Sequence, residues 1–348
     1  MTQDIVFAGY CTYKGLHLVT DAQAKRLTHL NIAFGEVRNN RVDISGILAH
    51  REELERIRRS NPHLAIVLST GGGGAGGHDT ASSPEHLAGF VQSTMEAVHT
   101  LALDGIDCDW EFPRNLKERE QHIQLMAAYR RELDELQAAR GRKCWLSIAA
   151  AAWDRYYEFV DIRRVAEMLD FVNLMTYDMR DAAWPTAVTG HHSNLYSPGK
   201  DSGQPYLDSI DLAVEKLVER GVPREKIVVG AAFYSRQWTG VPDVGHGMGV
   251  PMAAHSDYGP DYTAIAEVYE RDPAWTRYWD DTCKAPWLFN GETFITYDDP
   301  VSLAHKGRFV REKGIRGIMY WVHDADRTGR LFDALAQQLF PQAGDQRT

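Results

Sequence analysis

Residues 104–113 of the chain read DGIDCDWEFP. Apolar residues at 101, 103 and 106 lead into this stretch, and the pattern predicts a buried β-strand. Because side chains alternate along a strand, Asp107, Asp109 and Glu111 fall on one face, while Trp110 falls on the other. The stretch therefore predicts a strand that lines the interior of a sheet or barrel with three carboxyls.

Three acids spaced at roughly 6 to 7 Å repel one another unless they share protons. This repulsion raises the proton affinity of at least one acid, which suits a group that delivers a proton at neutral pH. Two other interpretations stay open. A charged edge strand would hold solvated acids, although the apolar residues around the stretch disfavour it. A divalent-metal site would use the same carboxyls, but no fourth ligand stands out in the sequence.

Seven further apolar runs rich in β-branched residues have the length of strands, and amphipathic helical segments lie between them. The eight strands are expected at residues 5–10, 29–35, 64–70, 105–111, 144–150, 171–177, 227–234 and 317–321. Clear helices are expected at 84–101, where Ser83 and Pro84 give a start signal, and at 207–220, before Gly221. This alternation predicts a (β/α)8 TIM barrel, and the fingerprint of an open dinucleotide-binding sheet is missing.

Two connections are longer than simple crossovers require. Residues 179–204 form a polar loop, and residues 238–297 separate the seventh strand from its helix. We expect the second to be a small α+β insertion in a single catalytic barrel domain of residues 1–340, with a tail at 341–348. Barrel enzymes carry their chemistry where the strands end, so residues at those ends are the first site candidates.

The 348 residues carry 48 acidic and 38 basic side chains, a formal net charge of −10, without a run of five basic residues. An extended nucleic-acid surface is therefore disfavoured. No apolar stretch approaches the roughly 18 residues of a membrane span. The first ten residues lack the features of a secretory signal, so we expect a cytoplasmic protein, or a secreted one if a leader was removed.

The chain has four cysteines without CxxC spacing: Cys11, Cys108, Cys144 and Cys283. We expect them to be reduced and buried, and to form neither disulfides nor a metal site. The adjacent His191 and His192 suggest a metal to a motif search, but neighbouring residues rarely converge on one ion. A role in loop folding is expected for them instead.

The stretch at 104–111 resembles the DGxDxDxE signature of glycoside hydrolase family 18, the chitinase family. Residues 69–72 (STGG) are similar to the family's SxGG, and residues 175–178 (MTYD) to its MxYD. Residues 232–236 (AFYSR) resemble PFYGR, with Ala and Ser as departures, and 317–321 looks like the end of the eighth strand. A further departure is Phe112, where Tyr is commoner. The resemblance covers nearly the whole chain.

The resemblance implies a retaining hydrolase that uses its substrate as the nucleophile. Glu111 would protonate the glycosidic oxygen while the substrate's N-acetyl carbonyl attacks the anomeric carbon and forms an oxazolinium. Asp109 would orient the acetamide, and Asp107 would share a proton with Asp109. Tyr177 would hydrogen-bond the attacking acetamido oxygen. No metal and no organic cofactor are expected.

Other residues at strand ends are candidate substrate contacts. Trp321 would stack beneath the sugar, because an apolar pyranose face matches an aromatic ring. The remaining candidates are Asp178, Arg236, Met175, Tyr10 and Phe34. The first two could instead form an ordinary ion pair, and the others could belong to the core. The resemblance also implies cis peptides at Ala33-Phe34, Glu111-Phe112 and Trp321-Val322.

The expected function is a chitinase that cleaves β-1,4 bonds between N-acetylglucosamine units of chitin or its oligomers. We expect a monomer without nucleic-acid or membrane partners. An endo-β-N-acetylglucosaminidase acting on N-glycans or cell-wall glycans is the alternative, because the same acids serve those substrates. A chitin-binding lectin on the same barrel typically loses the acid, whereas Glu111 is present here.

Overall fold

The computed structural model describes residues 5–180, 188–199, 208–251 and 256–341. These residues fall into two compact units. The first takes in the described residues up to Met175, together with Leu217–Val228 and Ile315–Met319. The second takes in the described residues of Thr176–Lys216 and Val229–Gly314, and those from Tyr320 onwards.

Eight strands form a closed parallel barrel, in the order β1-β14-β8-β7-β6-β5-β4-β2, and β1 also pairs with β2. Their bounds are β1 (Val6–Thr12), β2 (His29–Arg38), β4 (Ala65–Gly71), β5 (Gly105–Asp109), β6 (Trp145–Ala151), β7 (Phe171–Met175), β8 (Ile227–Ala232) and β14 (Gly317–Trp321). All eight predicted strands are present, and the predicted (β/α)8 fold is confirmed.

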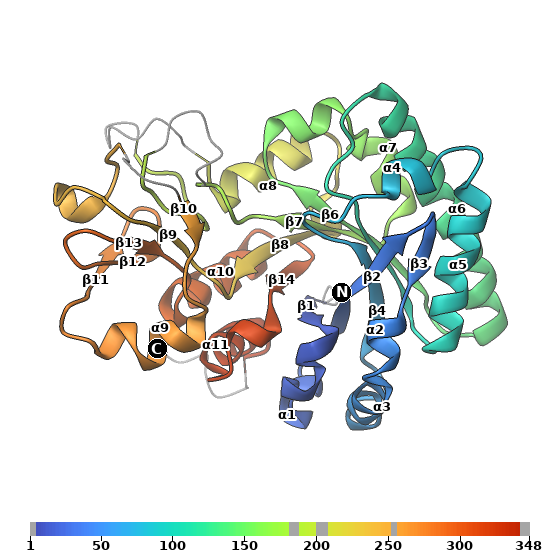
Figure 1. Cartoon of the computed structure of the whole chain (residues 1–348), viewed down its shortest axis with the longest axis horizontal. Coiled ribbons are helices and arrows are strands. Elements are labelled where there is room, and N and C mark those ends of the chain that lie inside the picture. The colour runs from blue at the N-terminus through green and yellow to red at the C-terminus, as the bar shows by residue number, and fades with distance from the viewer. Residues whose placement is uncertain (1–4, 181–187, 200–207, 252–255, 342–348) are drawn as a thin grey trace. The chain divides into compact units, whose positions relative to one another are not determined.

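Helices follow the strands in turn, as a (β/α)8 fold requires (Figure 1). They are α1 (Asp21–Ala24), α2 (Ser45–Leu48), α3 (Arg51–Ser60), α4 (His78–Ala81), α5 (Leu87–Thr100), α6 (Leu116–Arg140), α7 (Ile162–Met168), α8 (Ile210–Glu219), α10 (Pro300–Glu312) and α11 (Arg330–Leu339). Helix α5 buries Phe90, Met95 and Val98 with the expected helical spacing. None of the helices in the described ranges is both long and apolar enough to cross a membrane.

Helix α6 shows how the sequence sets an element's ends. The side chain of Asn115 caps its N-terminus by accepting a hydrogen bond from the backbone N–H of Glu118. Gly141 ends the helix in the left-handed conformation, with φ of 63°. The helix follows β5 in the chain and packs against its neighbours α5 and α7 (Figure 1).

Two local features differ from the sequence-based expectation. Strand β2 continues into a hairpin with β3 (Arg41–Asp43), whose turn residues Asn39 and Asn40 have φ of 50° and 60°. Asparagine tolerates this conformation better than most residues, so the NN pair was an available turn signal. Strand β5 ends at Asp109, so Glu111 lies just beyond the strand instead of closing it.

The second unit contains an antiparallel sheet between β8 and α10, in the order β10-β9-β13-β12-β11. Its strands are β9 (Arg236–Trp238), β10 (Ser256–Tyr258), β11 (Thr276–Asp280), β12 (Ala285–Phe289) and β13 (Phe294–Thr296), and helix α9 (Tyr262–Glu267) belongs to the same segment. Trp238, Trp287, Phe289 and Phe294 form its apolar core. The expected α+β insertion between the seventh barrel strand and its helix is therefore confirmed.

Candidate active site

Asp107 is fully buried, and four donors from four other strands hold its carboxylate. Oδ2 accepts hydrogen bonds from the Tyr10 hydroxyl and the Ser69 hydroxyl, each of 2.8 Å. Oδ1 accepts from the Ser147 hydroxyl at 2.6 Å and from the Asn173 amide at 3.1 Å. Burial raises the pKa of Asp107 above its ordinary value, and the four hydrogen bonds offset only part of this increase. The donors fix the position of this carboxyl.

Asp109 and Glu111 form a carboxyl pair next to Asp107. Burial, the charges of Glu111 and Asp107, and a hydrogen bond with Glu111 raise the pKa of Asp109 well above its ordinary value. Buried Asp109 and partly exposed Glu111 are in contact and cannot both ionise readily, so the pair retains a proton at pH values where an isolated aspartate has lost it. Oδ1 of Asp109 has no hydrogen-bond partner among the described residues.

The glycines after β4 lie against this pair. Gly71 has φ of +103°, and a Cβ there would lie 2.3 Å from the carbonyl oxygen of Asp109. The N–H of Gly72 donates to that same oxygen at 2.9 Å. A Cβ on Gly73 would lie 3.6 Å from each carboxyl oxygen of Glu111. The close approach of the Asp109 backbone thus requires a glycine at position 71, whereas a Cβ on Gly72 would lie 2.5 Å from the Phe34 ring.

The other face of the acidic stretch packs as the strand alternation predicts. Trp110 is buried and stacks on His78, with ring centroids 5.7 Å apart, and its ring meets His122 of α6 edge-on. Phe112 meets Trp153 edge-on at 5.0 Å. The peptide bonds Ala33-Phe34, Glu111-Phe112 and Trp321-Val322 are cis, as the resemblance implied.

Asp178 and Arg236 pair with each other within the second unit. The Arg236 Nε donates to Asp178 Oδ1 at 2.7 Å, and His192 Nδ1 lies 3.6 Å from the same oxygen. Burial opposes ionisation of Asp178, but His192 and Arg236 outweigh it and hold the pKa of the carboxyl below its usual range. The guanidinium also lies over the Tyr258 ring, 4.0 Å from its centroid. Asp178 and Arg236 therefore form an ion pair, and their expected contacts with substrate stay a prediction.

A buried ion pair in the second unit was not predicted. Lys306 and Asp298 are both inaccessible to solvent, and the Lys306 ammonium contacts both oxygens of the carboxylate. Asp298 Oδ2 also accepts from the Ser193 hydroxyl at 3.1 Å and from the Ala232 backbone N–H at 3.2 Å. Ser193 in turn lies within hydrogen-bond distance of the Thr176 carbonyl, directly before Tyr177. The pair ties the ends of two barrel strands to α10.

The remaining predicted contacts differ in exposure. Tyr10 is only 2% exposed, and its hydroxyl is engaged by Asp107. The structure thus places it as a support for Asp107, in place of the expected direct contact with substrate. Phe34, Met175, Tyr177 and Trp321 are partly exposed, so each can reach a ligand.

One group of three side chains in the described ranges has the spacing to hold a metal ion. It consists of His191, Asp280 and Cys283, and does not include the acids around β5. No motif connects them in the sequence, because the histidine and the aspartate are 89 positions apart. Folding of the insertion brings them together.

Comparisons with known proteins agree with the geometry. The family model for glycosyl hydrolases family 18 matches residues 6–326. A family 18 N-acetylglucosaminidase from Paenibacillus barengoltzii has a similar structure, with 41% identity and a TM-score of 0.91 over 96% of this chain and 100% of that one. Chitinase A1 of Niallia circulans is 29% identical over 84% of this chain, which spans 45% of that relative. A class V chitinase mutant of Nicotiana tobaccum, solved with NAG4, is 25% identical, with a TM-score of 0.85 over 97% and 99% of the chains.

Proposed function

Because the chain belongs to glycosyl hydrolases family 18, we propose that it is a chitinase. It hydrolyses β-1,4 bonds between N-acetylglucosamine units of chitin or chitooligosaccharides, with retention at the anomeric carbon. The observation that carries the proposal is the proton-holding pair of Asp109 and Glu111 beside the fixed carboxylate of Asp107. The similarity to Chitinase A1 and to the tobacco enzyme solved with NAG4 supports the substrate class.

Glu111 is the general acid in this proposal. Its carboxyl is partly exposed and shares a hydrogen bond with buried Asp109, so it can hold a proton next to solvent-accessible space. As the glycosidic bond breaks, this proton passes to the leaving oxygen. After the leaving sugar departs, Glu111 takes a proton from a water molecule whose oxygen attacks the anomeric carbon. The bond between that carbon and the acetamido oxygen breaks, which opens the oxazolinium and restores the acetamide.

Asp109 acts on the attacking side of the same step. Its Oδ1 has no partner among the described residues and can accept the N–H of the substrate's acetamide. This contact turns the acetamide carbonyl toward the anomeric carbon, and the negative charge stabilises the oxazolinium that forms. Asp107, held by four donors, acts on Asp109 through its charge, which contributes to the raised pKa of Asp109.

Tyr177 and Trp321 complete the proposal by family resemblance. The Tyr177 hydroxyl donates to the attacking acetamido oxygen, and the Trp321 ring stacks on the sugar. Both side chains are partly exposed, as these contacts require.

A second candidate is an exo-acting N-acetylglucosaminidase. It is favoured by the 41% identity to the Paenibacillus barengoltzii structure, which is described as an N-acetylglucosaminidase and is covered over its whole length by this chain. Both activities use the same acids and differ in where the chain is cut. Product analysis on a hexasaccharide of N-acetylglucosamine separates them, because an exo enzyme releases monomer from the first minute and an endo enzyme releases shorter oligomers.

The chemistry itself is tested by Glu111→Gln on the same hexasaccharide. Hydrolysis should fall by at least about 10² to 10⁴, the range attributed to general acid catalysis, while oligosaccharide binding persists. Glu120→Gln, on the exposed face of α6, is the matched control and should keep full activity. Near-normal hydrolysis by the Glu111 variant would contradict the proposal.

A further inference from the structure

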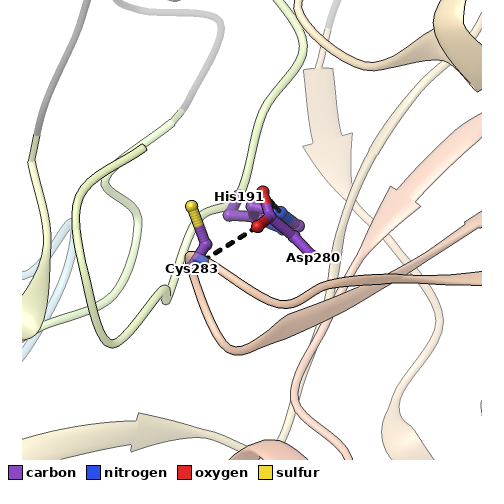
Figure 2. A group of neighbouring side chains, drawn as sticks. All are labelled: His191, Asp280 and Cys283. Atoms are coloured by element: carbon purple, nitrogen blue, oxygen red, sulfur yellow. Dashed lines mark hydrogen bonds and ion pairs between the residues drawn. The ribbon is translucent and has the colours of Figure 1, made fainter. Parts of the chain in front are cut away.

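Three side chains that the proposed reaction does not use meet at the turn between β11 and β12: His191, Asp280 and Cys283 (Figure 2). Each offers one ligand atom, and these atoms all lie within 4.8 Å of one another. His191 and Cys283 are buried, whereas the side chain of Asp280 is 23% exposed. We propose that this group is a binding site for Zn²⁺.

The ligand set selects the ion by its chemistry. A thiolate, an imidazole and a carboxylate are the three ligand types that Zn²⁺ takes in proteins, usually in a tetrahedral arrangement. Ca²⁺ and Mg²⁺ prefer sets made of oxygen atoms alone. The partly exposed edge of Asp280 leaves a side through which water can supply the fourth ligand.

The carboxylate is already held in a suitable orientation. Oδ1 of Asp280 accepts hydrogen bonds from the backbone N–H groups of Thr282 and Cys283, each of 2.9 Å. Oδ2 lies 3.4 Å from Nε2 of His191. Backbone contacts of this kind commonly orient a metal ligand, and here they leave the second oxygen available to the ion.

His191 supplies an independent observation. The residue is only 4% exposed, its Nε2 lies 3.4 Å from Asp280 Oδ2, and its Nδ1 has no hydrogen-bond partner within the described ranges. A buried polar atom without a partner is unfavourable, and native proteins rarely leave one unexplained. A metal ion bound by the ring would account for its burial beside Asp280 and Cys283.

The two segments that carry the ligands are joined before any ion binds. The carbonyl oxygen of Cys283 accepts hydrogen bonds from the backbone N–H groups of Leu195 at 3.0 Å and Tyr196 at 3.4 Å. In a tetrahedral zinc site, ligand atoms lie about 3.3 to 3.8 Å apart. The largest separation in the group therefore has to shorten by only about 1 Å, which side-chain rotation can supply.

Binding exchanges a proton for the metal. The Cys283 thiol loses its proton to solvent as the Zn–S bond forms, and the thiolate and carboxylate together balance the charge of the ion. Because the thiol must lose this proton to bind, affinity should increase as pH rises.

The test uses Co²⁺ as a spectroscopic substitute for Zn²⁺ on the full chain under reducing conditions. One equivalent of Co²⁺ should produce a thiolate-to-cobalt charge-transfer band, and one equivalent of Zn²⁺ should remove it. Cys283→Ser should abolish the band and weaken metal binding at least tenfold, and His191→Gln should weaken binding by a similar factor. Cys144→Ser is the matched control, because Cys144 is equally buried but belongs to no such group, and it should leave the band unchanged.

A His–Asp ion pair without a metal site predicts a different outcome. Wild-type protein would then show no thiolate band, or Cys283→Ser would bind the metal as tightly as wild type. Either result would overturn the proposal. If circular dichroism shows that Cys283→Ser does not fold, His191→Gln becomes the deciding variant. A charge-transfer band in His191→Gln with the cobalt affinity of the wild type would refute the site.

Discussion

The hydroxyl of Tyr10 donates a hydrogen bond of 2.8 Å to Oδ2 of Asp107, linking the first barrel strand to the acidic strand β5. Tyr10 is buried, so this bond acts through Asp107. Tyr10→Phe should lower the free energy of unfolding by about 1 to 3 kcal/mol, because a charged buried acceptor loses one donor. It should lower kcat and leave KM for oligosaccharides nearly unchanged. A large rise in KM with normal kcat would instead indicate a direct substrate contact.

The raised pKa of Asp109 predicts how stability depends on pH. An unfolded aspartate has a pKa of about 3.9, so above pH 4 the folded protein holds a proton that the unfolded chain has lost. The contribution of this proton to the free energy of unfolding is fully present below about pH 4 and is lost as pH rises through the pKa of Asp109 in the folded state. Asp109→Asn removes this dependence, so its stability relative to wild type should increase with pH, by at most about 1.4 kcal/mol per pH unit.

Asp178→Asn gives the control of opposite sign for that measurement. The pKa of Asp178 is lowered in the folded state, so its contribution is present above about pH 4 and is lost as pH falls. Urea unfolding from pH 2 to pH 8 should therefore show two separate changes relative to wild type. The stability difference of Asp178→Asn should fall as pH rises, but only below about pH 4, whereas that of Asp109→Asn should increase with pH above about pH 4. A constant difference for Asp109→Asn would contradict the assigned proton.

Gly71 tests the close approach of the backbone to the acids. Gly71→Ala places a Cβ 2.3 Å from the Asp109 carbonyl oxygen at φ of +103°, so it should destabilise the protein by more than about 2 kcal/mol and disturb turnover. Gly89→Ala is the matched control. Gly89 lies in helix α5 with no atom near the added methyl, so this change should stabilise by about 0.5 to 1 kcal/mol. Thermal unfolding of both variants measures the two changes in stability. Equal changes would argue against a steric requirement for glycine at position 71.

The Lys306–Asp298 ion pair tests the cost of an unpaired buried charge. Lys306→Met should destabilise the protein by about 3 to 5 kcal/mol, because Asp298 would remain buried without its cation. Arg41→Ala breaks a pair with Glu96 in which both side chains are more than half exposed, and it should cost about 0 to 1 kcal/mol. The difference in stability between the two variants is measured from their denaturant midpoints, provided that the dependence of the unfolding free energy on denaturant has the same slope in both. A loss below about 1 kcal/mol for Lys306→Met would contradict the expected cost of leaving Asp298 buried without its cation.

Much of the fold could be predicted because its signals are local. Apolar runs such as 171–175 and the helical spacing of Phe90, Met95 and Val98 mark elements without reference to the rest of the chain. The alternation of the acidic stretch likewise put Asp107 and Trp110 on opposite faces, as the structure has them.

What could not be predicted depends on contacts distant in sequence. Ser147 and Asn173 gave no signal by themselves, since a serine or an asparagine in a strand has many uses, yet both donate to Asp107. The group of His191, Asp280 and Cys283 forms only once the insertion folds. Tyr10 was expected to contact substrate, but its hydroxyl donates to Asp107, a partner distant in sequence that no local pattern reveals.

The most direct test of the central claim compares Glu111→Gln with Asp109→Asn on two substrates, a chitooligosaccharide and an aryl glycoside with a good leaving group. Glu111 is assigned to protonating the leaving oxygen, and an activated leaving group needs little protonation. Asp109 is assigned to the attacking acetamide, a requirement that the leaving group does not relieve. Turnover of the aryl glycoside should therefore be partly restored in Glu111→Gln and remain low in Asp109→Asn. Equal restoration in both variants, or none in Glu111→Gln, would contradict the assignment.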